Sequence, residues 1–152
     1  MSAFGPQRIV CLSTETCEVL YALGEQQRIV GISGFTVRPP QARKEKPKIG
    51  AFTSAKHDEI LALQPDLVLG YCDLQADIVA DLARAGLEVH LFNQRSIAGI
   101  LRMIRTLGAL VGATERAEAL IQELEQRMAA VAAQAATLPR RPRVYFEEWN
   151  EP

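Results

Sequence analysis

Residues 54–71 constrain the fold most, because they specify a helix, a break and a buried strand in direct succession. The helix is predicted from an apolar side between Ile60 and Leu63, with acidic residues in its first turn, where the helix dipole favours negative charge. Pro65 should end this helix, because the residue before a proline is pushed out of the α region. The apolar run 67–69 that follows is typical of a strand covered on both faces, as in a parallel sheet.

Two further strands are predicted upstream, over residues 8–12 and 28–33, and a fourth over residues 87–92. A helix that starts at Ser13 or Thr14 and ends before Gly24 joins the first two strands. Strand, helix and strand within about 25 residues form a parallel unit. The sequence therefore predicts an α/β fold, a Rossmann-like lobe whose central, mostly parallel sheet is flanked by helices. The alternating fourth strand should lie near an edge of the sheet.

The remaining segments of this lobe are less regular. Residues 34–50 are predicted to form an irregular, proline-rich loop. Asp73 is predicted to cap a helix that runs to Arg84, and Ser96 to cap the next helix. On the second of these helices, apolar residues recur at helical spacing: Ile97, Ile100, Leu101, Ile104, Leu107 and Val111.

A long helix is predicted from Thr114 to about Leu138, with a narrow apolar stripe. At about 1.5 Å per residue it would be roughly 36 Å long. It is either a packing or coiled-coil helix, or a rigid strut between two lobes. A new strand is predicted from Arg143 to the last residue. We therefore expect an N-terminal α/β lobe over residues 1–112, a backbone helix over 113–139 and the start of a second lobe over 140–152.

Composition excludes several classes of protein. A net charge of −1, with no long basic run, gives no support for nucleic-acid binding. No apolar run approaches the roughly 20 residues needed to cross a bilayer, so we expect membrane contact only through a partner. The first residues lack the pattern of a signal peptide, which taken literally predicts a cytoplasmic protein. The three cysteines have no zinc or disulfide spacing, and we expect buried small hydrophobes.

No catalytic constellation and no metal site is predicted. The turn after the first strand lacks the GxGxxG of a dinucleotide fold and the lysine of a phosphate-binding loop. His57 and His90 have no carboxylate or cysteine partner at ligand spacing, which favours structural or solvated roles for both. No Ser/His/Asp set is legible either.

The loops after the strands carry the candidate binding residues, because open α/β sheets bind ligands at the carboxyl ends of their strands. Aromatic and hydroxyl side chains gather there, which suits a flat, partly apolar ligand. Aromatics that merely cover the end of the sheet are the alternative. The candidates in these loops are Ser13, Thr14, Glu15, Phe35, Phe52, Thr53 and Tyr71.

Several segments resemble the helical-backbone (class III) substrate-binding proteins of ABC importers, above all the vitamin B12-binding branch and its ferric-siderophore relatives. These segments are Arg-Ile-Val-Cys-Leu-Ser (residues 8–13), Glu-Val-Leu-Tyr-Ala-Leu-Gly (18–24), Arg-Ile-Val-Gly-Ile-Ser (28–33), Arg-Pro-Pro (38–40) and residues 51–69. The likeness covers residues 8–152, and Leu-Ala-Leu-Gln-Pro-Asp-Leu-Val is its most specific part.

The resemblance implies a two-lobed protein that binds a corrinoid or a ferric chelate, with no covalently bound cofactor, and docks on a membrane permease outside the cytoplasm. Phe52 and Phe35 would face the ligand, residues 13–15 would line the floor, and Trp149 would face the cleft from the second lobe. Asp58, with Glu59 beside it, would dock on permease arginines. The alternative for these two acids is stabilisation of the helix end alone.

Two other classes of function stay open from the residues alone. One is a cytoplasmic α/β sensor or enzyme that reuses the lobe. The other is an interaction module that self-associates through the exposed long helix and the unpaired last strand.

Overall fold

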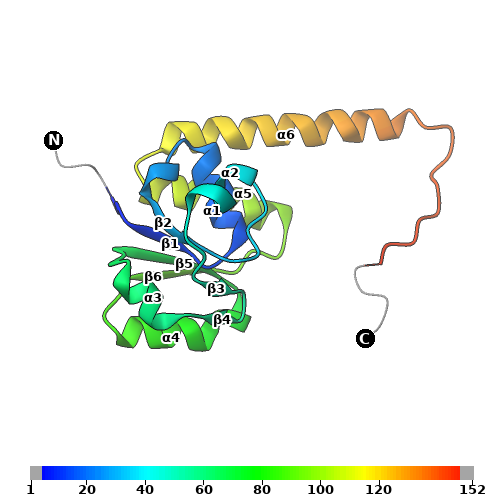
Figure 1. Ribbon diagram of the computed structural model, residues 1–152. Coiled ribbons are helices and arrows are strands. Elements are labelled where there is room, and N and C mark those ends of the chain that lie inside the picture. Colours follow the sequence, from blue (N-terminus) through cyan, green and yellow to red (C-terminus); the bar gives the residue numbers. More distant parts are fainter. Residues whose placement is uncertain (1–4, 148–152) are drawn as a thin grey trace. The chain divides into compact units, whose positions relative to one another are not determined.

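The computed structural model describes residues 5–147 of the chain (Figure 1). The chain divides into two compact units, residues 1–121 and residues 122–152. The first unit contains the sheet and all helices but the last, which begins in this unit. Within the described residues, no helix is long and apolar enough to span a membrane.

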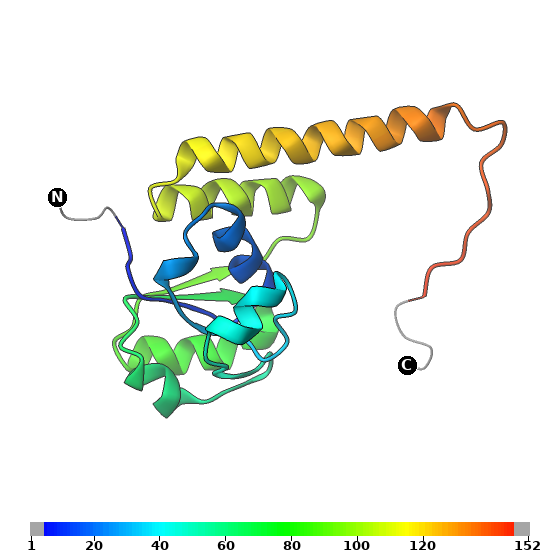
Figure 2. The same cartoon turned by 45° about the horizontal axis from the view of Figure 1, so that its top comes forward.

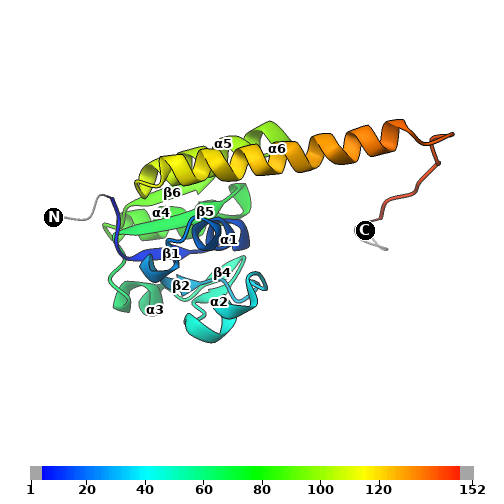
Figure 3. The ribbon, with the colours of Figure 1, turned by 90° about the horizontal axis from the view of Figure 1, so that it is seen from above.

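The centre of the first unit is a sheet of four parallel strands. Their order is β2 (Ile29–Ile32), β1 (Ile9–Cys11), β5 (Leu67–Tyr71) and β6 (Val89–Phe92), which Figure 3 shows from above. The central strand β1 is completely buried and pairs with β2 on one side and β5 on the other. The predicted parallel α/β sheet is confirmed, and so is the edge position of β6.

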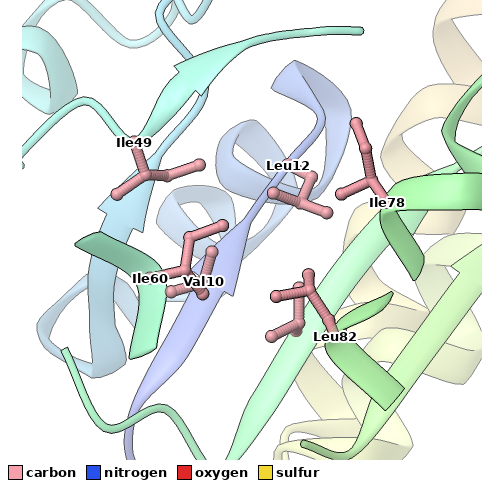
Figure 4. Packing of buried hydrophobic residues seen from close by; sticks show 7 residues of the cluster. Val10, Leu12, Ile49, Ile60, Ile78 and Leu82 are labelled. Atoms are coloured by element: carbon pink, nitrogen blue, oxygen red, sulfur yellow. The ribbon is translucent and has the colours of Figure 1, made fainter. Parts of the chain in front are cut away.

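Helices cover both faces of the sheet (Figure 2). One face carries α1 (Thr14–Ala22) and α5 (Ile97–Leu110), which contact each other. The other face carries α3 (His57–Ala62) and α4 (Ala76–Arg84). On that face Ile60 of α3 and Leu82 of α4, both fully buried, belong to one apolar cluster with Val10 and Val68 of the central strands (Figure 4). With this cluster on one face and α1 and α5 on the other, β1 and β5 are covered on both faces, as is usual in a parallel sheet.

The helix–break–strand segment is built as predicted. Helix α3 ends at Ala62, and Gln64 has a positive φ of 46°, so the chain leaves the α region before Pro65. The Arg8 guanidinium donates to the carbonyls of Leu63 and Gln64. These bonds satisfy carbonyls that the helix end leaves without intrahelical donors.

The irregular loop predicted over residues 34–50 is wrong in part. It contains the short helix α2 (Pro40–Glu45), which begins with a proline at its first position, where the missing N–H is not needed. Residues 50–55 form a small hairpin of β3 (Gly50–Ala51) and β4 (Ser54–Ala55). A short 3₁₀ turn, η1 (Gln26–Arg28), leads into β2.

Asp73 does not cap α4 as predicted. It begins a 3₁₀ turn, η2 (Asp73–Gln75), and α4 starts only after Gln75. Cys72, before this turn, has a positive φ of 61°, so the chain turns sharply at the end of β5. By contrast, the predicted cap at Ser96 is confirmed, since its Oγ accepts the N–H of Gly99 at 3.1 Å.

The apolar stripe of α5 faces inward only in part. Met103, Ile104 and Leu107 are buried, whereas Ile97 and Ile100 in the first turns are exposed. Ile97 and Ile100 therefore lie outside the core, although they recur at helical spacing with residues that are buried.

The last helix, α6 (Thr114–Ala136), confirms the predicted long helix. In the first unit, its residues Ala117 and Ile121 are buried. In the second unit, Met128 and Val131 are exposed. The strand predicted from Arg143 is absent over residues 143–147, which form neither helix nor strand, because no described strand pairs with them. Trp149 lies outside the described residues.

Candidate functional site

The loops after the four parallel strands meet at one edge of the sheet, here called the carboxyl edge. Backbone hydrogen bonds continue the sheet into these loops. The N–H of Leu12 donates to the carbonyl of Leu69 at 2.8 Å, and the N–H of Cys72 donates to the carbonyl of Phe92 at 2.7 Å. The N–H of Gly34 donates to the carbonyl of Gly50 at 2.7 Å, which attaches the β3–β4 hairpin to the loop after β2. The carboxyl edge is therefore a connected surface.

An aromatic pair lies on this surface. Phe52, at the tip of the β3–β4 hairpin, and Tyr71, at the end of β5, have ring centroids 6.4 Å apart and planes tilted by 51°. This is a favourable distance for an aromatic contact. Both rings are half-buried, so part of each stays open to solvent. Thr53, beside Phe52, is exposed.

Phe35 lies apart from this pair. It is 61% exposed and lines a shallow depression with Gly34, Ala51 and Lys56. The structure therefore brings together two of the three aromatic candidates and places the third on a neighbouring part of the carboxyl edge.

Arg95 is a member of the site that the sequence analysis did not select. Its guanidinium carbon lies 5.6 Å from the centroid of the Tyr71 ring, close enough for a cation–π contact. It also donates to the Tyr71 hydroxyl at 3.4 Å and to Asp73 at 3.0 Å. The Tyr71 hydroxyl in turn donates to the carbonyl of Gln94 at 3.3 Å. The signal that could have found Arg95 is its place directly after the fourth strand, at the same edge as Tyr71.

The floor residues 13–15 differ in their accessibility. Ser13 is completely buried, and its hydroxyl lies 3.2 Å from the Thr16 hydroxyl. Thr14 and Glu15 are half-buried, and the Thr14 hydroxyl donates to the Glu15 carboxylate at 3.4 Å. Of these three predicted residues, Thr14 and Glu15 have side chains that solvent reaches.

Gln75 lies beneath the loops and is almost completely buried. Its amide nitrogen donates to the carbonyls of Leu12 at 3.1 Å and Phe52 at 2.9 Å. Its amide oxygen accepts the N–H of Tyr71 at 2.9 Å. A glutamine in a turn after a strand carries no sequence signal for such a role, so sequence analysis missed it.

Exposed apolar side chains frame the carboxyl edge. Each follows the end of a strand: Phe35 and Val37 follow β2, Leu74 follows β5 and Ile97 follows β6. They account for four of the six large hydrophobic residues that are exposed in the described part of the first unit. These four side chains, called the apolar rim below, are therefore open to solvent on the loops of the carboxyl edge.

Asp58 and Glu59 lie in the first turn of α3, and both are exposed. Within residues 5–147, Glu59 pairs with Lys56 at 2.8 Å, whereas no hydrogen bond or ion pair engages Asp58. Because α3 directly follows the β3–β4 hairpin, these acids and Phe52 belong to one continuous segment.

The histidines and cysteines are the usual candidates for catalysis or metal binding. The His90 ring lies 4.2 Å from the Phe92 ring, and burial lowers the pKa of His90. His57 lies 4.0 Å from Asp81. The three cysteines are free and buried, as expected. Residues 5–147 contain no group of three or more His, Cys, Asp or Glu side chains placed to hold a metal ion.

Comparison with known proteins gives the family. The sequence profile of the periplasmic binding proteins matches residues 9–152. The chain therefore belongs to the periplasmic binding protein family.

Individual relatives agree with this assignment. A cobalamin-binding protein of Halobacterium salinarum is 33% identical over 144 residues, which cover 93% of this chain and 39% of that protein. The periplasmic haem-binding protein RhuT from Roseiflexus superposes with a TM-score of 0.81 and 28% identity, covering 91% of this chain and 53% of RhuT. The vitamin B12-binding protein BtuF of Vibrio cholerae shares the fold, with a TM-score of 0.77, 23% identity and coverage of 88% of this chain and 52% of BtuF. The chain thus spans about half the length of these proteins, or less.

Proposed function

We propose that this chain supplies one ligand-binding lobe of the substrate-binding component of an ABC importer, and that its ligand is cobalamin or a ferric chelate such as a siderophore complex or haem. The observation that carries the proposal is the half-buried pair of Phe52 and Tyr71 on the carboxyl edge, inside an apolar rim. The relatives include a cobalamin-binding protein and a haem-binding protein, which supports the class of ligand.

The chemistry of this edge suits a macrocycle or chelate. Two tilted rings offer a broad apolar contact, and the nearby Arg95 and Asp73 offer a donor and an acceptor for polar groups at the ligand's periphery. The metal of such a ligand arrives already held by its chelator, so the protein need not supply a set of ligating side chains. Binding and release, without a chemical step, would be the whole activity, and we propose no enzymatic role.

The rest of the ligand site would come from a second lobe. In this proposal residues 1–112 form the first lobe, residues 113–139 the backbone helix and residues 140–152 the start of the second lobe, where Trp149 would face the ligand. Phe35, Thr53, Thr14 and Glu15 would surround the aromatic pair. Ser13, because it is buried, would support the floor from below.

The proposed partner is the importer's membrane permease, met outside the cytoplasm. Asp58 and Glu59 would make the contact, because they are exposed at the tip of a short helix whose Ile60 anchors it in the core. Neither a sensor or enzyme role nor self-association is favoured by an observation in the described residues.

Calorimetric titration tests the ligand class. The panel is cyanocobalamin, haemin, a ferric hydroxamate and a ferric catecholate. At least one should bind, and Phe52→Ala should weaken that binding about tenfold or more, because an aromatic contact and its buried area are lost. Val131→Ala, at an exposed position of the proposed backbone helix, is the control and should leave the affinity unchanged. Absence of binding to all four ligands, by this chain and by a chain that includes the second lobe, contradicts the proposal.

A further inference from the structure

We infer that Gln75 is a positioning residue, whose one side chain holds the Phe52 loop against the end of β5 and so sets the aromatic pair for the ligand. The effect of Gln75 on ligand binding rests on the proposed function. The positioning of the Phe52 loop by Gln75 rests only on the hydrogen bonds of its side chain. The side chain is only 1% exposed, so it contributes to the site from beneath and has no direct access to a ligand.

The carboxamide group is what joins three separate segments. Its amide nitrogen has two hydrogens, and they reach two carbonyls: Leu12, which is 63 residues away in the chain, and Phe52, which is 23 residues away. Its oxygen accepts the N–H of Tyr71. A carboxylate could accept the third bond but donate neither of the first two, and a hydroxyl has a single hydrogen. A glutamine therefore fits this position better than a glutamate, a serine or a threonine.

The Phe52 loop needs such support from outside. It is the tip of a hairpin whose strands have only two residues each, and a hairpin this short is marginally stable at best on its own. The bond from Gly34 holds the base of the hairpin at Gly50 and leaves its tip to other contacts. The bond from Gln75 reaches the carbonyl of Phe52 itself. The same amide group also accepts the N–H of Tyr71, so one side chain is bonded to the backbone of both members of the aromatic pair.

Gly70 leaves room for this arrangement. A Cβ atom at this position would lie 3.1 Å from the amide oxygen of Gln75 and 2.9 Å from a methyl carbon of Leu91. Any larger residue at position 70 would therefore push on the group that holds the loops. The hydrogen bonds of Gln75 therefore depend both on the residue in the turn η2 and on the glycine near the end of β5.

Amide hydrogen exchange tests, without any ligand, whether the Gln75 side chain holds the neighbouring backbone in place. The variant Gln75→Met keeps the length of the side chain and removes its hydrogen bonds. The Tyr71 amide should then exchange at least about tenfold faster, while the Val68 and Leu69 amides in the same strand keep their protection. Gln41→Met, on the exposed side of α2, is the matched control and should change none of these rates. Equal acceleration along all of β5, or none at Tyr71, overturns the inference.

A double-mutant cycle tests the consequence for binding, with the panel ligand that the wild-type chain binds most tightly. Phe52→Ala should weaken binding strongly in the wild type but at most about twofold in the Gln75→Met background, because the ring is no longer held in place. A merely destabilising effect of Gln75→Met would leave the two losses additive, and additivity overturns the inference.

Gln75→Glu is the second variant, for the case that Gln75→Met does not fold. Burial beside two carbonyl oxygens raises the pKa of such a carboxyl group, and the protonated form can donate one hydrogen bond. The ligand affinity of the Gln75→Glu variant, relative to that of the wild type, should therefore rise as pH falls from about 8 to about 5. If the ratio of the two affinities stays constant over this range, the inference is contradicted. If the wild type binds no panel ligand, the proposed function fails, whereas Tyr71 exchange still decides the role of Gln75.

Discussion

Cys17 makes the stability of the first unit sensitive to alkaline pH. Burial raises the pKa of the Cys17 thiol from 9.0 to about 11, and burial with the neighbouring Cys17 also raises the pKa of Cys11. Between these two pH values the unfolded chain loses the Cys17 proton while the folded chain keeps it. The free energy of unfolding should therefore be insensitive to this group below pH 9.0 and fall as pH rises toward about 11.

Urea denaturation at pH 7.5, 9 and 10.5 measures this effect. Each thiol should contribute a decrease of at most about 1.4 kcal/mol per pH unit. Cys17→Ala removes one of the titrating groups, so its stability should fall less steeply above pH 9 than that of the wild type. Parallel curves for the two proteins would mean that the Cys17 thiol is not protected by the fold.

Single residues of the site could be predicted from the sequence only where their type is informative. Phe52 and Tyr71 are aromatic and follow predicted turns and strands, so they were selected, and the structure places their rings in contact. Arg95 and Gln75 act through partners that lie far away in the chain. Which distant residues meet depends on the register of the sheet, and this register is not visible in any local pattern.

Among the elements, α5 begins at a cap whose contribution can be measured. Ser96 has an extended backbone and accepts the N–H of Gly99, one of the N–H groups that a helix start leaves unpaired. Ser96→Ala should lower the free energy of unfolding by about 1 kcal/mol. Ser96→Asp, which keeps an oxygen at the same place, should retain most of the stability. Equal losses for both variants in urea denaturation would show that the cap is not what Ser96 contributes.

Elements with a buried face were predictable, and those without one were not. The strands β1, β2, β5 and β6 were found because their apolar runs are needed in the core, and α5 and α6 because their caps or apolar periods are strong. Helix α2 buries only the small Ala42, and each strand of the β3–β4 hairpin has two residues, so neither segment shows an apolar period. The prediction for Asp73 is wrong because an aspartate looks the same in the sequence at the start of a 3₁₀ turn as in front of an α-helix.

At the scale of the whole molecule, a substitution should be able to weaken docking on the permease without changing the affinity for the ligand. Asp58→Lys combined with Glu59→Lys reverses the charge at the tip of α3, while Ile60 keeps the helix anchored. Association with permease in proteoliposomes should fall by about tenfold or more, since like charges across an interface are repulsive. Ligand affinity should stay within about twofold of the wild type, because the changed side chains point into solvent.

Asp77→Lys with Glu88→Lys, two exposed acids away from α3, is the matched control for this charge reversal. It changes the net charge by the same amount, so it should alter permease association only slightly. A collapse of ligand binding in the Asp58 and Glu59 variant would instead assign these acids to the fold or the pocket.

The carboxyl edge by itself should bind its ligand weakly, because it presents one open surface. Sites for small ligands commonly enclose about 70–90% of the ligand, whereas an edge such as this one can contact roughly one side of it. The apolar rim of Phe35, Val37, Leu74 and Ile97 is exposed in the first unit, as expected for a surface that a second lobe covers. Calorimetry should therefore show an affinity at least about a hundredfold lower for this chain than for a chain that adds a second lobe, since each tenfold step corresponds to about 1.4 kcal/mol of lost contact. Equal affinities would place the whole ligand site within residues 1–152 and would contradict the proposed role of a second lobe.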